Sequence, residues 1–132
     1  MLKIFCVLSI FLLASCESFS ADQKAMLRRP FDAVDASEII VLPTNFAFEI
    51  ELPSNPSTGY DWSFVIDTTD VIRPNGYRYT KDLSDRLGVP GISTWSFKTL
   101  KRGSAQVLFS YQPIDAQGAR VTRRVNFEIQ VK

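Results

Sequence analysis

Histidine is absent from the 132-residue sequence, and cysteine occurs only twice. Cys6 lies within the apolar run from Ile4 to Ala14, which follows Lys3 and is typical of a secretory signal peptide. Cys16 comes directly after this segment, so the remainder of the chain has no thiol and cannot form a disulfide. Without histidine or a free cysteine, the chain cannot build a Ser-His-Asp or Cys-His relay or the usual zinc sites. We therefore expect a protein that is not an enzyme and that holds neither a metal nor a cofactor.

Paired carboxylates are the remaining way to build a hydrolytic site, because glycosidases use two acids and no histidine. Five aspartates lie in polar, turn-rich regions of the sequence: Asp61, Asp67, Asp70, Asp82 and Asp85. Aspartate in such regions most often shapes a turn by bonding to nearby backbone groups. We interpret these five residues as turn formers.

An excess of charge of one sign is also missing, since 15 Lys and Arg residues face 14 Asp and Glu residues. Loss of Lys3 with the signal peptide leaves the mature chain formally neutral. A neutral domain lacks the basic surface that nucleic-acid binding requires, so we expect no nucleic-acid partner.

The apolar N-terminal run is too short to remain in a bilayer as a spanning helix. It ends at Leu13-Ala14-Ser15-Cys16, which resembles the lipobox of bacterial lipoproteins. That resemblance implies cleavage before Cys16, a diacylglyceryl group on its sulfur, and export to the cell envelope, at the outer membrane or the periplasmic face. The alternative is an ordinary secretory signal with a chance cysteine. We expect a signal peptide over 1–15, a lipidated N-terminus and tether over 16–35, and one domain over 36–132.

Apolar residues after position 38 recur with a period of two, which is typical of strands that bury one face. The clearest run has Phe46, Phe48, Ile50 and Leu52 on one face. Comparable runs begin near Ile39, Trp62, Trp95, Val107 and Val125, and turn-forming residues lie at 53–59, 74–76, 88–91, 101–103 and 115–118. This spacing predicts an all-β, immunoglobulin-like sandwich of about seven to eight strands. We assign Trp62, Trp95 and Tyr111 to the core or to loop support, and Arg123-Arg124 to a solvated strand end.

Binding residues on such a sandwich usually lie on its loops. The segment Asn55-Pro56-Ser57-Thr58-Gly59-Tyr60 combines a fixed proline φ with a permissive glycine, so it predicts a narrow and stiff protrusion. Such a tip is suited to entering a cleft, because little conformational entropy is lost on binding.

This segment, followed by Trp62, resembles the hallmark loop of the chagasin family of inhibitors of papain-like cysteine peptidases. The family's glycine-rich loop is similar to Gly88-Val89-Pro90-Gly91, which leads to Trp95. Its Arg-Pro-Trp loop corresponds to Gln112-Pro113-Ile114, where the arginine and the tryptophan are both replaced.

The resemblance implies three binding loops at one end of the sandwich that reversibly and tightly occlude the cleft of a papain-like peptidase. Thr58, with Ser57 and Gly59, would lie over the catalytic Cys-His pair of the target. The third loop lacks its usual anchors, which implies weaker binding or a different choice of target. The protein would act as a monomer. The alternative is a surface-anchored adhesion or envelope-assembly module that keeps the sandwich without binding a peptidase.

Overall fold

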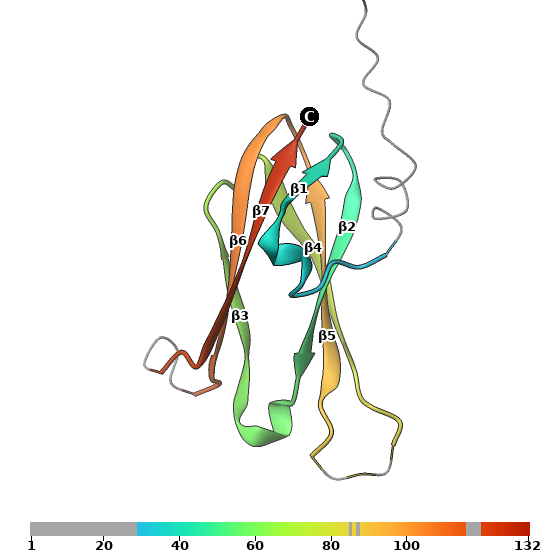
Figure 1. Ribbon diagram of the computed structural model, residues 1–132, viewed down its shortest axis with the longest axis vertical. Coiled ribbons are helices and arrows are strands. Elements are labelled where there is room, and N and C mark those ends of the chain that lie inside the picture. The colour runs from blue at the N-terminus through green and yellow to red at the C-terminus, as the bar shows by residue number, and fades with distance from the viewer. Residues whose placement is uncertain (1–28, 85, 87, 116–119) are drawn as a thin grey trace, which may run out of the picture.

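The computed structural model describes residues 29–84, 86, 88–115 and 120–132 (Figure 1). The predicted signal peptide, Cys16 and most of the predicted tether lie outside these residues. No helix within the described residues is long and apolar enough to cross a membrane.

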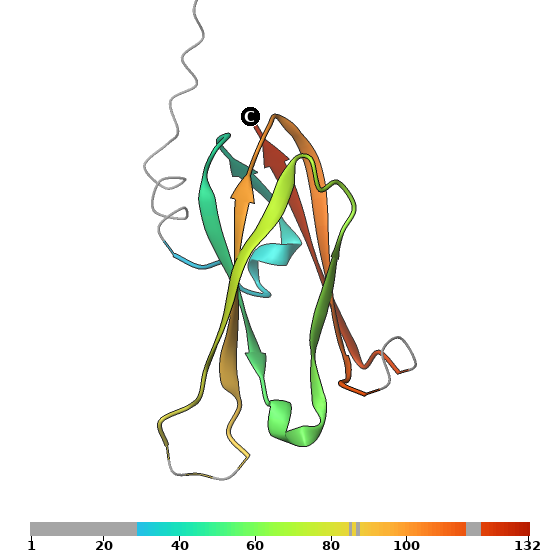
Figure 2. The same ribbon diagram turned by 180° about the vertical axis from the view of Figure 1, so that it is seen from behind.

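Seven strands form two facing sheets, which confirms the predicted all-β sandwich (Figures 1 and 2). The strands are β1 (Ile39–Leu42), β2 (Ala47–Ser54), β3 (Tyr60–Ile66), β4 (Ile72–Thr80), β5 (Gly91–Thr99), β6 (Gly103–Pro113) and β7 (Arg123–Val131). Two single-turn 3-10 helices, η1 (Asp35–Ser37) and η2 (Pro56–Thr58), accompany them. One sheet has the order β1-β7-β6-β3 and the other β2-β5-β4. Only β1 and β7 pair in parallel; the other neighbouring strands are antiparallel.

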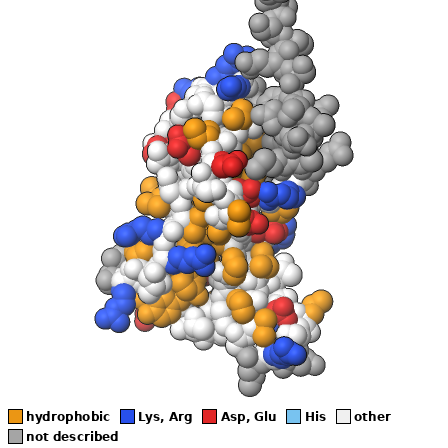
Figure 3. Space-filling model, in the orientation of Figure 1, with side chains coloured by type: hydrophobic (Ala, Val, Ile, Leu, Met, Phe, Trp, Pro, Cys, Tyr) orange, Lys and Arg blue, Asp and Glu red, His pale blue; other side chains and the backbone are white. Residues whose placement is uncertain are grey.

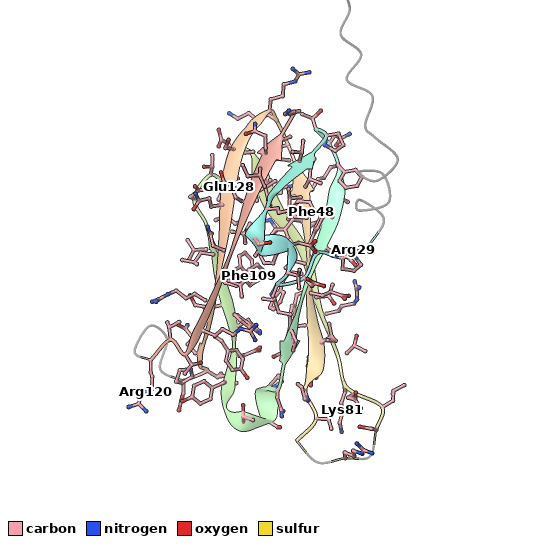
Figure 4. The ribbon with its side chains drawn as sticks, in the orientation of Figure 1. Arg29, Phe48, Lys81, Phe109, Arg120 and Glu128 are labelled. Atoms are coloured by element: carbon pink, nitrogen blue, oxygen red, sulfur yellow. The ribbon has the colours of Figure 1, made fainter. Side chains whose placement is uncertain are left out.

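Aromatic rings fill the space between the sheets. Phe109 lies at their centre, with its ring centroid 4.8 Å from that of Trp95, 5.5 Å from Phe64 and 5.8 Å from Phe127 (Figure 4). Such pairs add about 0.5–1.5 kcal/mol each beyond the burial of their area. The alternation seen in the sequence therefore produces a core that needs no disulfide.

The predicted turn at 74–76 is wrong, because these residues lie inside β4. The register with β5 shifts between Pro74 and Gly76, which leaves one residue of β4 unmatched as a β-bulge. β4 is an edge strand of its sheet. Proline and glycine are tolerated at edges and bulges, since a missing ladder hydrogen bond there costs little. The local turn signal was overridden by pairing with β5.

The segment before η1 is part of the packed domain. Phe31 is only 1% exposed and its backbone closes a parallel bridge beside β2, with Phe31 N–H donating to Glu49 O and Glu51 N–H donating to Phe31 O, both at 2.8 Å. Asp35 is also buried, and it accepts hydrogen bonds from both terminal nitrogens of Arg29. The domain therefore begins earlier than the residue 36 expected from the sequence.

The Arg29–Asp35 pair predicts a loss of stability in acid. Hydrogen bonding to Arg29 holds the pKa of Asp35 below its usual value of 3.8. Because the folded-state pKa is the lower one, the stabilisation is present above the unfolded-state pKa and is lost as the pH falls through the folded-state value. Arg29 is half-exposed, so we expect the free energy of unfolding to drop by about 1–2 kcal/mol between pH 6 and pH 2 from this pair. Denaturant titrations of the wild type and Asp35→Asn should converge at low pH; a constant gap between them would contradict this.

Candidate functional site

Three loops lie at the same end of the sandwich (Figures 1 and 2). We call them the first loop (55–59, between β2 and β3), the second loop (81–90, between β4 and β5) and the third loop (114–122, between β6 and β7). Residues 85, 87 and 116–119 lie outside the described part. The first loop stands between the other two in both views.

The first loop is a tight turn built on η2. Pro56 occupies its first turn, where a missing N–H costs nothing, and Gly59 ends it at a φ of 79°, in the left-handed region. Thr58 N–H donates to Asn55 O at 3.1 Å, and the Thr58 hydroxyl donates to the same oxygen at 2.7 Å. Ser57, Thr58 and Gly59 are all exposed at the tip. The stiff, outward turn expected from the sequence is present.

The base of the first loop is fixed to the sandwich. The indole N–H of Trp62 donates to Pro53 O at 2.9 Å, and the Ser54 hydroxyl donates to Asp61 Oδ1 at 2.8 Å. Asp61 Oδ1 also accepts from the backbone N–H of Trp62. The carboxylate therefore joins the two strands that flank the loop, which is a structural role. Trp62 is 8% exposed, so it supports the loop from the core as expected.

Hydrogen bonds also connect the first loop to both neighbours. The side-chain amide of Asn55 donates to Gly88 O in the second loop at 3.4 Å, and Ile114 N–H donates to Gly59 O from the third loop at 2.9 Å. The loops therefore hold a fixed order and form one continuous surface.

The second loop presents a mixture of exposed and covered residues. Gly88 has a φ of 84°, Pro90 is exposed, Val89 is half-buried, and Gly91 is buried at the start of β5. Hydrogen bonds from Ser84, including its backbone N–H at 2.7 Å, lower the pKa of Asp82 below its usual value. Leu83 is 98% exposed and was not singled out from the sequence, because one apolar residue in a polar loop gives no periodic signal.

Gly91, the first residue of β5 after the second loop, has no room for a side chain. A Cβ there would lie 2.4 Å from Thr80 O and 2.6 Å from the Tyr79 hydroxyl oxygen, so the strands that carry the second loop would have to separate. We expect Gly91→Ala to destabilise the fold by about 1–3 kcal/mol. Gly76→Ala is the control, since its nearest neighbour would be 3.8 Å away. Thermal melts of the two variants should differ clearly, and equal melting temperatures would contradict the crowding.

The segment Gln112-Pro113-Ile114, predicted as a binding loop, exposes fewer side chains than the sequence suggested. Gln112 and Pro113 belong to β6, where they pair with Asp61 and Tyr60. Gln112 is only 8% exposed and Pro113 is half-buried, whereas Ile114 is 52% exposed. Of the three residues predicted to contact a partner here, Ile114 has the most exposed side chain.

The first loop offers contact groups without ionisable side chains. The first loop carries no titratable side chain, and the described residues hold no group of three or more His, Cys, Asp or Glu side chains that could bind a metal. The tip of the first loop is narrow and exposes backbone groups and the hydroxyls of Ser57 and Thr58, so it is suited to filling a groove on another macromolecule.

Comparison with known proteins identifies the fold and the family. Residues 41–131 match the sequence pattern of the Chagasin family peptidase inhibitor I42. The cysteine protease inhibitor EhICP2 from Entamoeba histolytica is similar in structure, with a TM-score of 0.66 and 20% identity over 79% of this chain and 94% of that one. Amebosin gives a TM-score of 0.60 with 21% identity over 78% and 96% of the two chains.

PbICP-C, solved in complex with falcipain-2, gives a TM-score of 0.58 with 15% identity over 79% of this chain and 90% of that one. At these identities the structures demonstrate a shared fold. No curated protein matches the sequence. The family pattern covers the strands from β1 to β7 together with all three loops, and the chain belongs to the chagasin family of peptidase inhibitors, which are not enzymes.

Proposed function

We propose that this protein inhibits papain-like cysteine peptidases by placing the first loop in the active-site cleft. The observation that carries the proposal is the exposed, uncharged tip at Thr58, bonded on both sides to its neighbouring loops. Membership of a peptidase-inhibitor family and the fold shared with PbICP-C, which was solved bound to falcipain-2, support the same target class.

Inhibition follows from steric exclusion of the substrate. Internal hydrogen bonds already hold the turn in one conformation, so the loop loses little conformational entropy when it binds, and little of the binding free energy is offset. Pro56 and the left-handed Gly59 remove the extended backbone that a peptidase needs for cleavage. The second loop lies alongside, where its exposed backbone can pair with an edge of the cleft. No covalent bond forms, and the complex is reversible.

The test is an inhibition assay with a protein that begins at residue 29, so that Phe31 and the Arg29–Asp35 pair are kept. Titration into papain and falcipain-2 with fluorogenic peptides should abolish activity at or below micromolar concentration, and trypsin should stay fully active. Full activity of both cysteine peptidases at that concentration would refute the proposal. An adhesion or envelope-assembly role has no specific observation in its favour.

We also propose that the mature chain is exported and held at the cell envelope by a lipid on Cys16. The support is the Leu13-Ala14-Ser15-Cys16 motif after the apolar run. Phe31 pairs with Ile50 in the middle of β2, whereas the first loop follows Ser54, the last residue of β2. A tether that precedes Phe31 therefore joins the domain at a distance from the first loop. Mass spectrometry of the full chain expressed in a bacterial host should detect a lipidated N-terminal cysteine, and Cys16→Ser should release the protein from the membrane fraction. An unmodified wild-type protein would disprove the anchor.

A further inference from the structure

Three arginines, called the arginine cluster below, lie within a stretch of five residues where the third loop leads into β7; Arg123 and Arg124, as neighbours on a strand, project from opposite faces of their sheet. Arg123 and Arg124 open β7, Arg120 precedes them in the third loop, and all three are exposed. Figure 4 shows Arg120 pointing away from the sandwich at this end, and Figure 3 shows basic side chains next to a hydrophobic area on the same side. Asp115 is the only acidic residue between positions 107 and 127. This corner of the loop surface is therefore strongly basic.

The start of β7 is held in place by neighbouring strands. Arg123 pairs in register with Tyr111, which in turn pairs with Trp62. Thr122 N–H donates to Tyr111 O at 2.9 Å, and the Arg123 guanidinium carbon lies 5.9 Å from the centroid of the Trp62 ring. A cation over an indole face is attracted to it, which limits the positions that the side chain samples. Arg123 and Arg124 thus sit on paired strand backbone, and Arg120 lies in the third loop before them.

These arginines form no ion pair within the described part of the chain, where the salt bridges are made by Arg29, Arg78 and Lys101. Asp61, the acid nearest in register on β3, is occupied by hydrogen bonds from Ser54 and the Trp62 backbone. The charges of the cluster are therefore free to meet those of a partner.

The cluster lies within the footprint of an inhibitor that uses the first loop. Trp62 is the third residue of β3, about 7 Å along the strand from Tyr60, which directly follows the first loop. A standard interface buries about 800 Å² on each partner, a patch roughly 30 Å across. A peptidase that accepts Thr58 in its cleft would place one cleft wall near Ile114 and Arg123.

We propose that Arg120, Arg123 and Arg124 form a basic rim that selects target peptidases bearing carboxylates on the cleft wall next to the third loop. This inference rests on the proposed inhibitory function. Guanidinium groups bind carboxylates with two parallel hydrogen bonds, and charges at an interface rim mainly accelerate association.

The experiment compares a triple variant, Arg120→Gln, Arg123→Gln and Arg124→Gln, with the wild type. Association rates are measured by stopped-flow inhibition with papain and falcipain-2, at about 0.02 M and about 0.5 M NaCl. For the more tightly bound enzyme, the wild-type rate should fall about tenfold with added salt. The triple variant should associate about tenfold more slowly at low salt and respond little to salt.

The matched control is Arg73→Gln, Arg102→Gln and Lys132→Gln, which removes the same charge from exposed residues at the other end of the sandwich. It should stay within about twofold of the wild type, because it lies beyond the screening length from the loops. If the two triple variants associate equally fast while the wild type inhibits, the rim is refuted and the inhibitory function stands. If the wild type inhibits neither enzyme, both proposals fall.

Discussion

Replacing Thr58 by arginine should raise the inhibition constant for a papain-like peptidase at least about 100-fold. Thr58 lies exposed at the tip of the first loop, so the larger, charged side chain would have to enter the cleft ahead of the backbone. Truncation or replacement of a central interface residue typically costs 2–4 kcal/mol, and about 2.8 kcal/mol corresponds to a factor of 100. The measurement is a steady-state inhibition titration.

The same substitution should leave the fold intact. It removes the hydroxyl bond to Asn55 O, about 1 kcal/mol, but keeps the backbone bond from Thr58 N–H to the same oxygen. The melting temperature should therefore fall by no more than about 5 °C. A large loss of stability would instead assign the loop a structural role.

Two further variants make the result specific. Thr58→Ser keeps the hydroxyl that bonds to Asn55 O, so its inhibition constant should rise only a few-fold. Thr69→Arg places the same side chain in an exposed turn between β3 and β4, at the opposite end of the sandwich, and should inhibit like the wild type. Wild-type inhibition by Thr58→Arg would show that another surface meets the target.

The fold follows from the sequence where one strand face is buried throughout. Phe48, Ile50 and Leu52 are all at most 4% exposed, as their alternation with glutamates predicts. β4 escapes this reasoning because every residue after Ile72 is exposed, and its Pro74-Asn75-Gly76 segment has local turn chemistry that only pairing with β5 overrides. Period-two analysis detects a strand through burial, and an edge strand with exposed residues gives little such signal.

The candidate site was predictable to the extent that its geometry is local. Pro56 and Gly59 fix the first loop through their own backbone preferences, which are readable in the sequence. The burial of Gln112 depends on pairing between β6 and β3, and the proximity of Arg123 to Trp62 depends on three adjacent strands. Contacts of this kind arise only when residues distant in sequence are brought into register.

The packing of Phe31 was also not predictable from the sequence. It forms a single β-bridge outside the named strands, and one residue gives no hydrophobic periodicity. Its side chain is fully covered and meets Phe48 edge-on, with ring centroids 6.1 Å apart. We expect Phe31→Ala to lower the free energy of unfolding by about 3–5 kcal/mol, because a large cavity would open beside β2. Val34→Ala is the control: Val34 is 78% exposed, and its loss should change stability by less than about 0.5 kcal/mol.

Truncation gives an independent measurement of the same contact. A protein that begins at residue 29 keeps Phe31 and the Arg29–Asp35 pair, whereas one that begins at residue 36 loses both, together with two backbone hydrogen bonds to β2. The shorter protein should melt roughly 15 °C lower or more, since each kcal/mol shifts the melting temperature of a domain this size by about 4–8 °C. Equal melting temperatures for the two proteins would mean that the segment before η1 adds nothing to the domain, and that the buried ring of Phe31 is replaced without cost.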